Sequence, residues 1–160
     1  MREGAIQVRM GEVRFSHHGV LACYALGSCV ATVLYDETAR LGGVAHVVLP
    51  GSAPQGSPFP GRYAHQAIDW LAAGMSARGV DPRRCRTYLV GGARLLQLDP
   101  PHRGTNIGAQ NIEAVRSVLK TYGIVHAKED VGGTQGRTMR LEVETGRVTV
   151  SRVGQEAEVL

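Results

Sequence analysis

One cysteine and one histidine in this chain have the properties of a nucleophile and its base. Cys29 follows two small residues, Gly27 and Ser28, and His46 lies seventeen residues later. A cysteine attacks carbon as the thiolate, and a nearby imidazole can take the thiol proton and later give it to a leaving amine. The small residues before Cys29 allow backbone N–H groups to approach a developing oxyanion. The pair therefore indicates attack on a carbonyl group with release of an amine.

The two residues lie on segments that we predict to be adjacent β-strands. Residues 30–35 and 44–49 are apolar and rich in β-branched side chains. The polar link between them includes Gly42 and Gly43 and is typical of a turn. An antiparallel hairpin of these two runs would bring the beginning of the first strand beside the end of the second.

The register of this hairpin decides whether Cys29 and His46 meet. A turn centred between Glu37 and Thr38 places them directly opposite each other, with Cβ atoms about 4.5–5.5 Å apart. A shift by one residue would turn them to opposite faces of the sheet. In an alternative interpretation, neither residue is catalytic: Cys29 is a small buried hydrophobic residue, and His46 is a hydrogen-bonded histidine within a strand.

Composition and charge limit the classes of function. The chain has 160 residues, which suits a single domain over 1–160, and we expect the polar tail 154–160 to be frayed. The net charge of +4 favours an acidic partner, but no basic run is dense enough for a nucleic-acid-binding surface. The three cysteines, Cys23, Cys29 and Cys85, have no metal-ligand spacing, and no apolar run is long enough to span a membrane. We expect a cytoplasmic protein with reduced thiols.

The remaining pattern predicts an α+β fold. Two amphipathic helices are expected over 63–78 and 108–122, each followed by a glycine, Gly79 and Gly123. About eight short segments have the pattern of strands, mostly in hairpins, so antiparallel pairing should dominate. A loop rich in Gly, Ser and Pro, 51–61, follows the second apolar run and has the length of a lid or a substrate contact.

The glycine pairs support a further hypothesis, that the protein binds a phosphate or a nucleotide. Gly91-Gly92-Ala93 follows a predicted strand, as phosphate-binding turns do, but it lacks the spacing of the common phosphate-binding motifs. Arg94 and Arg137 are the nearby basic side chains that could anchor a phosphate. We rank this hypothesis last.

Several motifs follow one another along most of the chain. They are Leu26-Gly27-Ser28-Cys29-Val30, Ala45-His46-Val47-Val48-Leu49-Pro50, Gly61-Arg62-Tyr63-Ala64, Gly91-Gly92-Ala93, Asn106-Ile107-Gly108-Ala109-Gln110-Asn111 and Asp130-Val131-Gly132-Gly133. In this order and at these spacings the chain resembles the chemoreceptor glutamine deamidase family, CheD. The resemblance implies a mixed, largely antiparallel β-sandwich flanked by helices, similar to the fold of bacterial toxin glutamine deamidases.

The resemblance also implies a reaction and the residues that perform it. CheD proteins convert selected glutamines of methyl-accepting chemoreceptors to glutamates. Cys29 would attack the carboxamide, His46 would act as base and then as acid, and backbone N–H groups of Ser28 and Cys29 would hold the oxyanion. A thioester would form and be hydrolysed, without a metal or other cofactor. The implied partners are the receptors, with no nucleic acid and no insertion into a membrane.

One position departs from the family pattern. The family has a threonine six residues before the nucleophile, and this chain has Cys23 there. A thiol is a weaker hydrogen-bond partner than a hydroxyl group and would orient His46 less firmly. CheD proteins also bind the chemotaxis phosphatase CheC. A weakly active or inactive regulatory module for CheC is therefore the alternative function.

Overall fold

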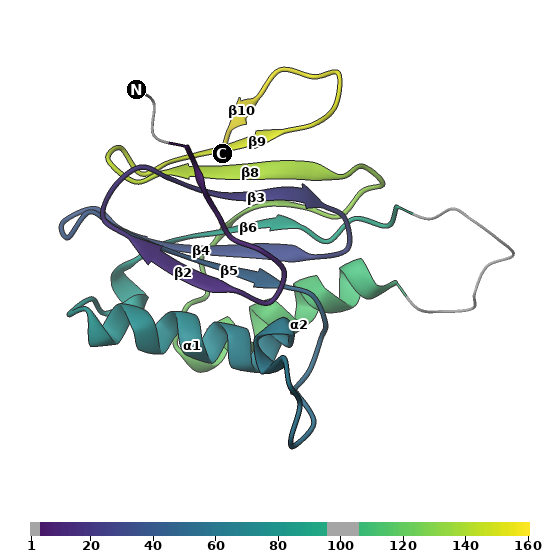
Figure 1. Ribbon diagram of the computed structural model, residues 1–160, viewed down its shortest axis with the longest axis horizontal. Helices are drawn as coiled ribbons and strands as arrows, with labels where there is room; N and C mark the ends of the chain where they lie inside the picture. The colour runs from purple at the N-terminus through teal and green to yellow at the C-terminus, as the bar shows by residue number, and fades with distance from the viewer. Residues whose placement is uncertain (1–3, 96–105) are drawn as a thin grey trace, which may run out of the picture.

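The computed structural model describes residues 4–95 and 106–160, and in that part of the chain ten strands form two sheets (Figure 1). The strands are β1 (Ile6–Gln7), β2 (Val13–Ser16), β3 (Val20–Leu26), β4 (Val30–Asp36), β5 (Leu41–Val47), β6 (Arg86–Gly91), β7 (Lys128–Val131), β8 (Arg137–Glu142), β9 (Arg147–Ser151) and β10 (Glu158–Val159). The first sheet has the order β1-β3-β8-β9-β10, and the second has the order β2-β5-β4-β6-β7. The pairs β1–β3 and β6–β7 are parallel, and the other pairs are antiparallel. The expected α+β fold, a mixed and largely antiparallel sandwich with helices, is confirmed.

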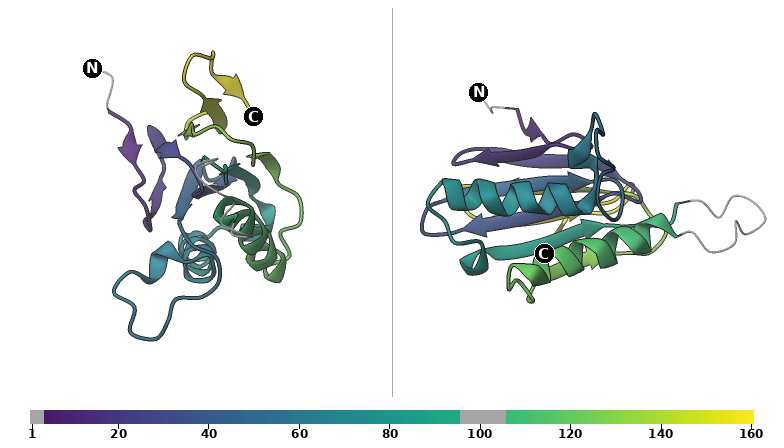
Figure 2. Two further views of the ribbon diagram at one scale, coloured as in Figure 1. Left: turned by 90° about the vertical axis from the view of Figure 1, so that its right-hand side faces the viewer. Right: turned by 90° about the horizontal axis from the view of Figure 1, so that it is seen from below.

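The second sheet lies between the first sheet and the helices. Two α-helices, α1 (Ala64–Ala77) and α2 (Ile107–Thr121), pack side by side on its outer face (Figures 1 and 2). One apolar cluster fills the space between this sheet and the helices, and a second cluster fills the space between the two sheets. The central strands β4 and β5 are therefore buried on both faces, which explains why they appear in the sequence as continuous apolar runs.

Both helices occur where the hydrophobic periodicity predicts them. The side chain of Asn106 caps α2 by accepting a hydrogen bond from the backbone N–H of Ala109 at 3.0 Å. Gly79 and Gly123 follow the two helices with φ of 80° and 75°, the left-handed conformation that ends a helix most readily at glycine. The apolar stripe of each helix faces the second sheet.

The prediction that Gly42 and Gly43 belong to the turn is wrong, because both lie inside β5. A Cβ atom on Gly42 would come within 2.5 Å of Leu141 in the first sheet. A Cβ atom on Gly43 would come within 2.9 Å of Leu71 in α1. Glycine is thus required here by close packing on the two faces of a buried strand, and not by a bend in the chain.

The end of the chain is more regular than we expected. The tail 154–160 contains β10, whose residues Glu158 and Val159 pair with β9 at the edge of the first sheet. None of the helices in residues 4–95 and 106–160 is long and apolar enough to cross a membrane.

A buried tyrosine connects the two sheets. The hydroxyl group of Tyr35, on β4, donates a hydrogen bond of 2.8 Å to the carbonyl oxygen of Val143, which directly follows β8. The ring packs so closely on Gly146 that a Cβ atom there would lie 2.3 Å from it. This contact holds the first sheet against the strand that begins beside Cys29.

We expect Tyr35→Phe to lower the free energy of unfolding by about 1–2 kcal/mol, because it leaves the buried Val143 carbonyl without its donor. Urea unfolding followed by circular dichroism measures this change. Tyr24→Phe, at a half-exposed tyrosine, serves as the control and should have little effect. Equal stability changes in the two variants would show that the inter-sheet hydrogen bond contributes nothing.

Candidate active site

Cys29 and His46 lie at the same end of the second sheet, where β4 begins and β5 ends (Figure 1). The predicted direct opposition of these residues is wrong. The register pairs His46 with Ala31, so that the strands are shifted by two residues from the prediction. The turn is centred between Thr38 and Ala39, because β5 begins at Leu41.

A shift of two residues keeps the two side chains on one face. Ala31 shares a face with its partner His46, and Cys29 precedes Ala31 by two residues. Ala31 belongs to the cluster between the sheets, and Cys29 packs against the same cluster. The cysteine and the histidine are thus diagonal neighbours on the inter-sheet face, about 7–8 Å apart, a separation that brings a neighbour within reach of an aromatic side chain such as that of His46.

His46 is held in one orientation by a backbone group. Its Nδ1 atom lies 2.9 Å from the carbonyl oxygen of Val8, and the ring is only 4% exposed. A carbonyl oxygen can only accept, so Nδ1 carries the proton and Nε2 is the acceptor. Val8 is itself fixed, since its N–H donates to the Ala22 carbonyl oxygen at 2.8 Å.

The electrostatic environment keeps both groups neutral. Burial lowers the pKa of His46, so its imidazole is uncharged at neutral pH. Burial raises the pKa of the Cys29 thiol, and a hydrogen bond from the Cys29 backbone N–H opposes this shift only in part. Both shifts favour a neutral thiol and a neutral imidazole over a thiolate and an imidazolium.

Cys23, the residue at the family's threonine position, does not hold His46 in this structure. It lies on β3, fully buried in the inter-sheet cluster, and pairs with Met139 of β8. Burial is the main cause that raises the pKa of Cys23, and the neighbouring Cys29 adds to it. Cys23 thus lies beside Cys29, while the Val8 carbonyl orients the histidine.

The glycine-rich segment 91–93 supports the backbone around Cys29. The N–H of Gly92 donates to the carbonyl oxygen of Cys29, and the N–H of Ala93 donates to that of Gly27, both at 2.8 Å. A Cβ atom on Gly91 would lie 2.2 Å from the Cys29 carbonyl oxygen, so only glycine permits this approach. These N–H groups are engaged by the protein, which removes the donors that a phosphate would need.

Asn111 makes a polar contact with the site that we did not predict from the sequence. It is fully buried on α2, and its Nδ2 donates to the carbonyl oxygens of Ser28 and Val48, each at 2.9 Å. One feature of the sequence could have indicated it. Asn111 lies four residues before Val115 on the apolar stripe of the helix, where a buried polar side chain needs a hydrogen-bond partner. Nothing in the sequence indicates the role of the Val8 carbonyl, because every residue type has the same backbone carbonyl group.

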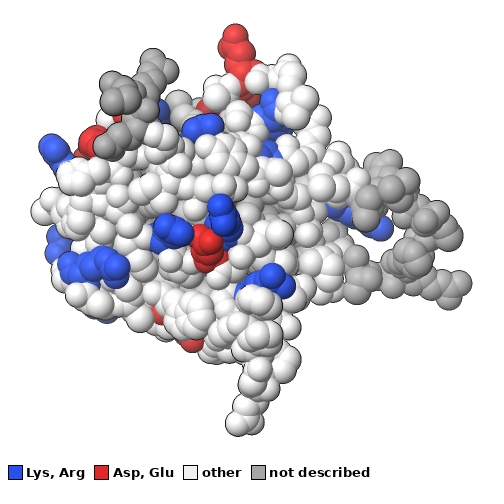
Figure 3. Space-filling view, viewed as in Figure 1, with Lys and Arg blue, Asp and Glu red and all other residues white. Residues whose placement is uncertain are grey.

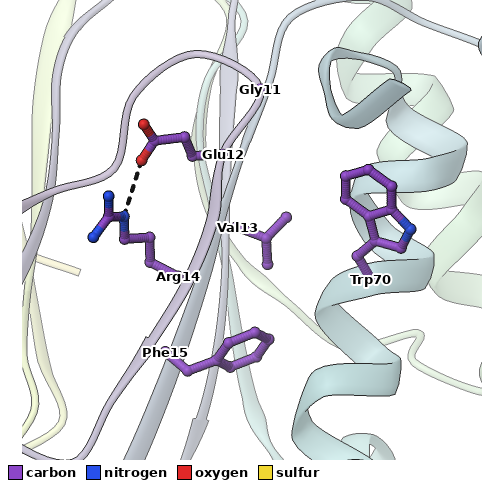
Figure 4. A pocket seen from close by; sticks show the side chains of 6 residues that line it. All are labelled: Gly11, Glu12, Val13, Arg14, Phe15 and Trp70. Atoms are coloured by element: carbon purple, nitrogen blue, oxygen red, sulfur yellow. Dashed lines mark hydrogen bonds and ion pairs between the residues drawn. The ribbon is translucent and has the colours of Figure 1, made fainter. Parts of the chain in front are cut away.

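Two hollows lie near the site. One, of about 450 Å³, lies between β2 and α1 and is lined by Gly11, Glu12, Val13, Arg14, Phe15 and Trp70 (Figure 4). The Glu12–Arg14 ion pair, at 2.9 Å, points away from Trp70 on the other side of the strand, and none of the six lining residues is a nucleophile (Figure 4). The other, of about 680 Å³, is lined by Tyr24, Leu95 and Arg137 among others, and Leu95 packs directly on Gly27. The second hollow therefore borders the loop that carries Cys29.

Basic side chains are spread over one face of the molecule. Figure 3 shows Lys and Arg side chains over the region of β2 and α1, with few acidic side chains among them. Within residues 4–95 and 106–160, no cluster of three His, Cys, Asp or Glu side chains could hold a metal ion. The reactive side chains that the structure brings to this end of the sheet are a thiol and an imidazole, which make it a candidate site of the cysteine–histidine class.

Comparison with known proteins places this chain in a family. The family model described as CheD chemotactic sensory transduction matches residues 48–152. A probable chemoreceptor glutamine deamidase CheD of Symbiobacterium thermophilum is 42% identical over 153 residues, covering 92% of each chain. The chemoreceptor glutamine deamidase CheD of Thermotoga maritima is 38% identical and covers 85% of this chain and 83% of its own. A probable chemoreceptor glutamine deamidase CheD of Methanococcus maripaludis is 37% identical, with 97% and 99% covered.

The chain belongs to the CheD family. The resemblance expected from the motifs is therefore confirmed. Its curated relatives carry the name of an enzyme, a chemoreceptor glutamine deamidase.

We expect alkylation of Cys29 by iodoacetamide to accelerate about tenfold per pH unit from pH 7 to about 8.5, because only the thiolate reacts and burial raises the pKa of this thiol. Peptide mapping locates the modification, and Cys29→Ser gives the background from Cys23 and Cys85. A rate that is already constant below pH 7 would mean that the thiolate is preformed, against this description.

Proposed function

We propose that this protein is a chemoreceptor glutamine deamidase that converts receptor Gln side chains to Glu through a thioester at Cys29. The observation that carries the proposal is the placement of Cys29 and of a neutral His46, with Nδ1 held by the Val8 carbonyl, on one face of adjacent strands. Membership of the CheD family, with relatives named for this reaction, supports the choice of substrate.

The first half of the reaction forms the thioester. His46 Nε2 takes the proton of the Cys29 thiol as the sulfur attacks the carboxamide carbon of the glutamine. The carbonyl oxygen becomes an oxyanion, which the backbone N–H groups of Ser28 and Cys29 stabilise by about 2.7–4 kcal/mol per donor. The C–N bond then breaks, and the imidazolium gives its proton to the leaving group, which departs as ammonia.

The second half returns the enzyme to its starting state. His46 takes a proton from a water molecule, whose oxygen attacks the thioester carbon. The oxyanion forms again in the same place and collapses by breaking the C–S bond, and the imidazolium gives its proton to the departing sulfur of Cys29. The products are the glutamate side chain and the Cys29 thiol, so no metal or cofactor takes part.

The surface of the protein suits an acidic partner. The net charge of +4 and the basic face in Figure 3 favour encounter with the acidic helices of a receptor's cytoplasmic part, and this attraction weakens with salt. The hollow beside Gly27 is the concave surface through which a glutamine would approach Cys29. We therefore propose that the protein acts in the cytoplasm.

A regulatory module for CheC is the second candidate function, and Cys23 is the observation that favours it. Cys23 replaces the hydroxyl group that the family places beside the site. The hydrogen bond between His46 and Val8 supports retained activity, because it orients the imidazole without help from position 23. Deamidation is therefore the preferred function.

Incubation with a receptor cytoplasmic fragment should add about 1 Da per modified glutamine, because hydrolysis of the thioester replaces NH₂ by OH. Intact-mass spectrometry measures the gain, and Cys29→Ala should abolish it. A gain that persists in Cys29→Ala would exclude the thiol mechanism. No gain with the wild-type protein, together with binding to CheC, would favour the regulatory module.

We expect Cys23→Thr to change kcat for receptor deamidation by less than roughly threefold, because the Val8 carbonyl already orients His46. The measurement is the initial rate of ammonia release at saturating receptor fragment. A rise of tenfold or more in Cys23→Thr would show that the missing hydroxyl group limits the reaction, and that the Val8 contact is insufficient.

A further inference from the structure

Asn111 joins the two halves of the candidate site. The Nδ2 group donates at 2.9 Å to the carbonyl oxygen of Ser28, directly before the nucleophile, and at 2.9 Å to that of Val48, two residues after His46. One side chain from α2 therefore fixes the spacing between the loop that carries the cysteine and the strand that carries the histidine.

The contact with Ser28 also sets the direction of a neighbouring N–H group. In a trans peptide unit the carbonyl group and the following N–H point in opposite directions within one plane. The Ser28 carbonyl and the Cys29 N–H belong to the same unit, so holding the carbonyl from α2 directs the N–H away from the helix. The backbone N–H of Cys29 partly offsets the raised pKa of its own thiol, which agrees with an N–H that points to the Sγ side, where an attacked carbonyl group would sit.

The flanking peptide units are fixed in the same way. Ala93 holds the carbonyl oxygen of Gly27, and Gly92 holds that of Cys29. Asn111 supplies the middle contact, and it is the only one of the three that comes from a side chain. A substitution at this position can therefore alter the contact without changing the backbone of the supporting segment.

The side chain of Asn111 satisfies its donor but not its acceptor. Its Oδ1 atom is buried and has no hydrogen-bond partner among the described residues. An unpaired buried acceptor is unfavourable, and asparagine is a weaker helix former than leucine. A leucine would remove the unpaired acceptor but would leave the carbonyl groups of Ser28 and Val48 without this donor, so the two donated hydrogen bonds are the feature that asparagine provides here.

We propose that Asn111 is a positioning residue that aligns the Cys29 N–H as the oxyanion donor and holds it in register with the His46 strand. This role rests on the proposed function only in requiring that Cys29 attacks a carbonyl group. Asn111 itself touches neither the substrate nor the thiol in the proposed reaction.

The test compares two reactions of the same thiol. Acylation of Cys29 by 4-nitrophenyl acetate passes through a tetrahedral oxyanion, whereas alkylation by iodoacetamide does not. We expect Asn111→Leu to slow acylation roughly 10–100-fold and to leave alkylation within about threefold of wild type. Asn111→Ser, which keeps one donor, should recover part of the acylation rate. Gln110→Leu, at an exposed amide on the same helix, is the matched control and should change neither rate.

Equal losses in both reactions, or no loss in either, would overturn the proposal, because a structural role would not separate them. Thermal melting shows whether each variant is folded. If Asn111→Leu does not fold, the wild-type protein gives a second test. Its ratio of acylation to alkylation rates should exceed that of N-acetylcysteine, and an equal ratio would mean that no oxyanion donor is aligned.

Receptor deamidation separates this proposal from the proposed function. In an active enzyme, Asn111→Leu should lower kcat with little change in KM, because the aligned N–H acts on the transition state. If the wild-type protein does not deamidate the receptor fragment, the proposed function fails. The two thiol reactions still test the role of Asn111 in that case.

Discussion

Hydrogen bonds to three consecutive carbonyl groups hold the loop 27–29 against the segment 91–93 and helix α2. The rest of the site depends on this contact. A nucleophile at the beginning of a strand has neighbours on one side only, so its backbone needs support from elsewhere in the chain. Gly91 allows the supporting strand to approach the loop within hydrogen-bonding distance, and Gly92 allows the same segment to pack against α2, which closes the remaining side. Residues far apart in the sequence are therefore needed to hold the backbone of this one short loop in place.

Burial of the second sheet on both faces gives the site its electrostatic character. The first sheet covers one face and the two helices cover the other, so His46 lies in a dry environment next to a backbone carbonyl group. Burial lowers the pKa of the imidazole and raises that of the Cys29 thiol. A neutral pair is suited to proton transfer during the attack, and it protects the thiol from adventitious oxidation at neutral pH. The same layers that stabilise the fold thus set the proposed mechanism.

The sequence predicts the elements of this fold better than their exact pairing. The periodicity of 63–78 and 108–122 predicts both helices, because an amphipathic stripe is a local property. The register of β4 and β5 is set by packing against two layers, which is not local, and the predicted hairpin is shifted by two residues. The even shift preserves the shared face of Cys29 and His46, so the candidate pair is compatible with the structure despite the error.

Residues that act through their backbone or through long-range contacts were beyond the sequence interpretation. The carbonyl group of Val8 orients His46, although nothing in the type of residue 8 indicates this. Asn111 belongs to one of the family motifs, but its hydrogen-bond partners Ser28 and Val48 are distant in sequence, so the contact could not be predicted. Cys23 is the opposite case, since its departure from the family pattern is plain in the sequence, while the contact that holds His46, the Val8 carbonyl, is seen only in the structure.

The central claim is that Cys29 forms the covalent intermediate, and trapping that intermediate tests it most directly. The wild-type protein would be mixed with a receptor fragment, quenched in acid within its first turnover, and analysed by mass spectrometry with peptide mapping. The account predicts an adduct with the combined mass of the two chains less one ammonia, joined through Cys29 and absent in Cys29→Ala. An adduct on Cys23 or Cys85, or turnover by Cys29→Ala, would contradict it.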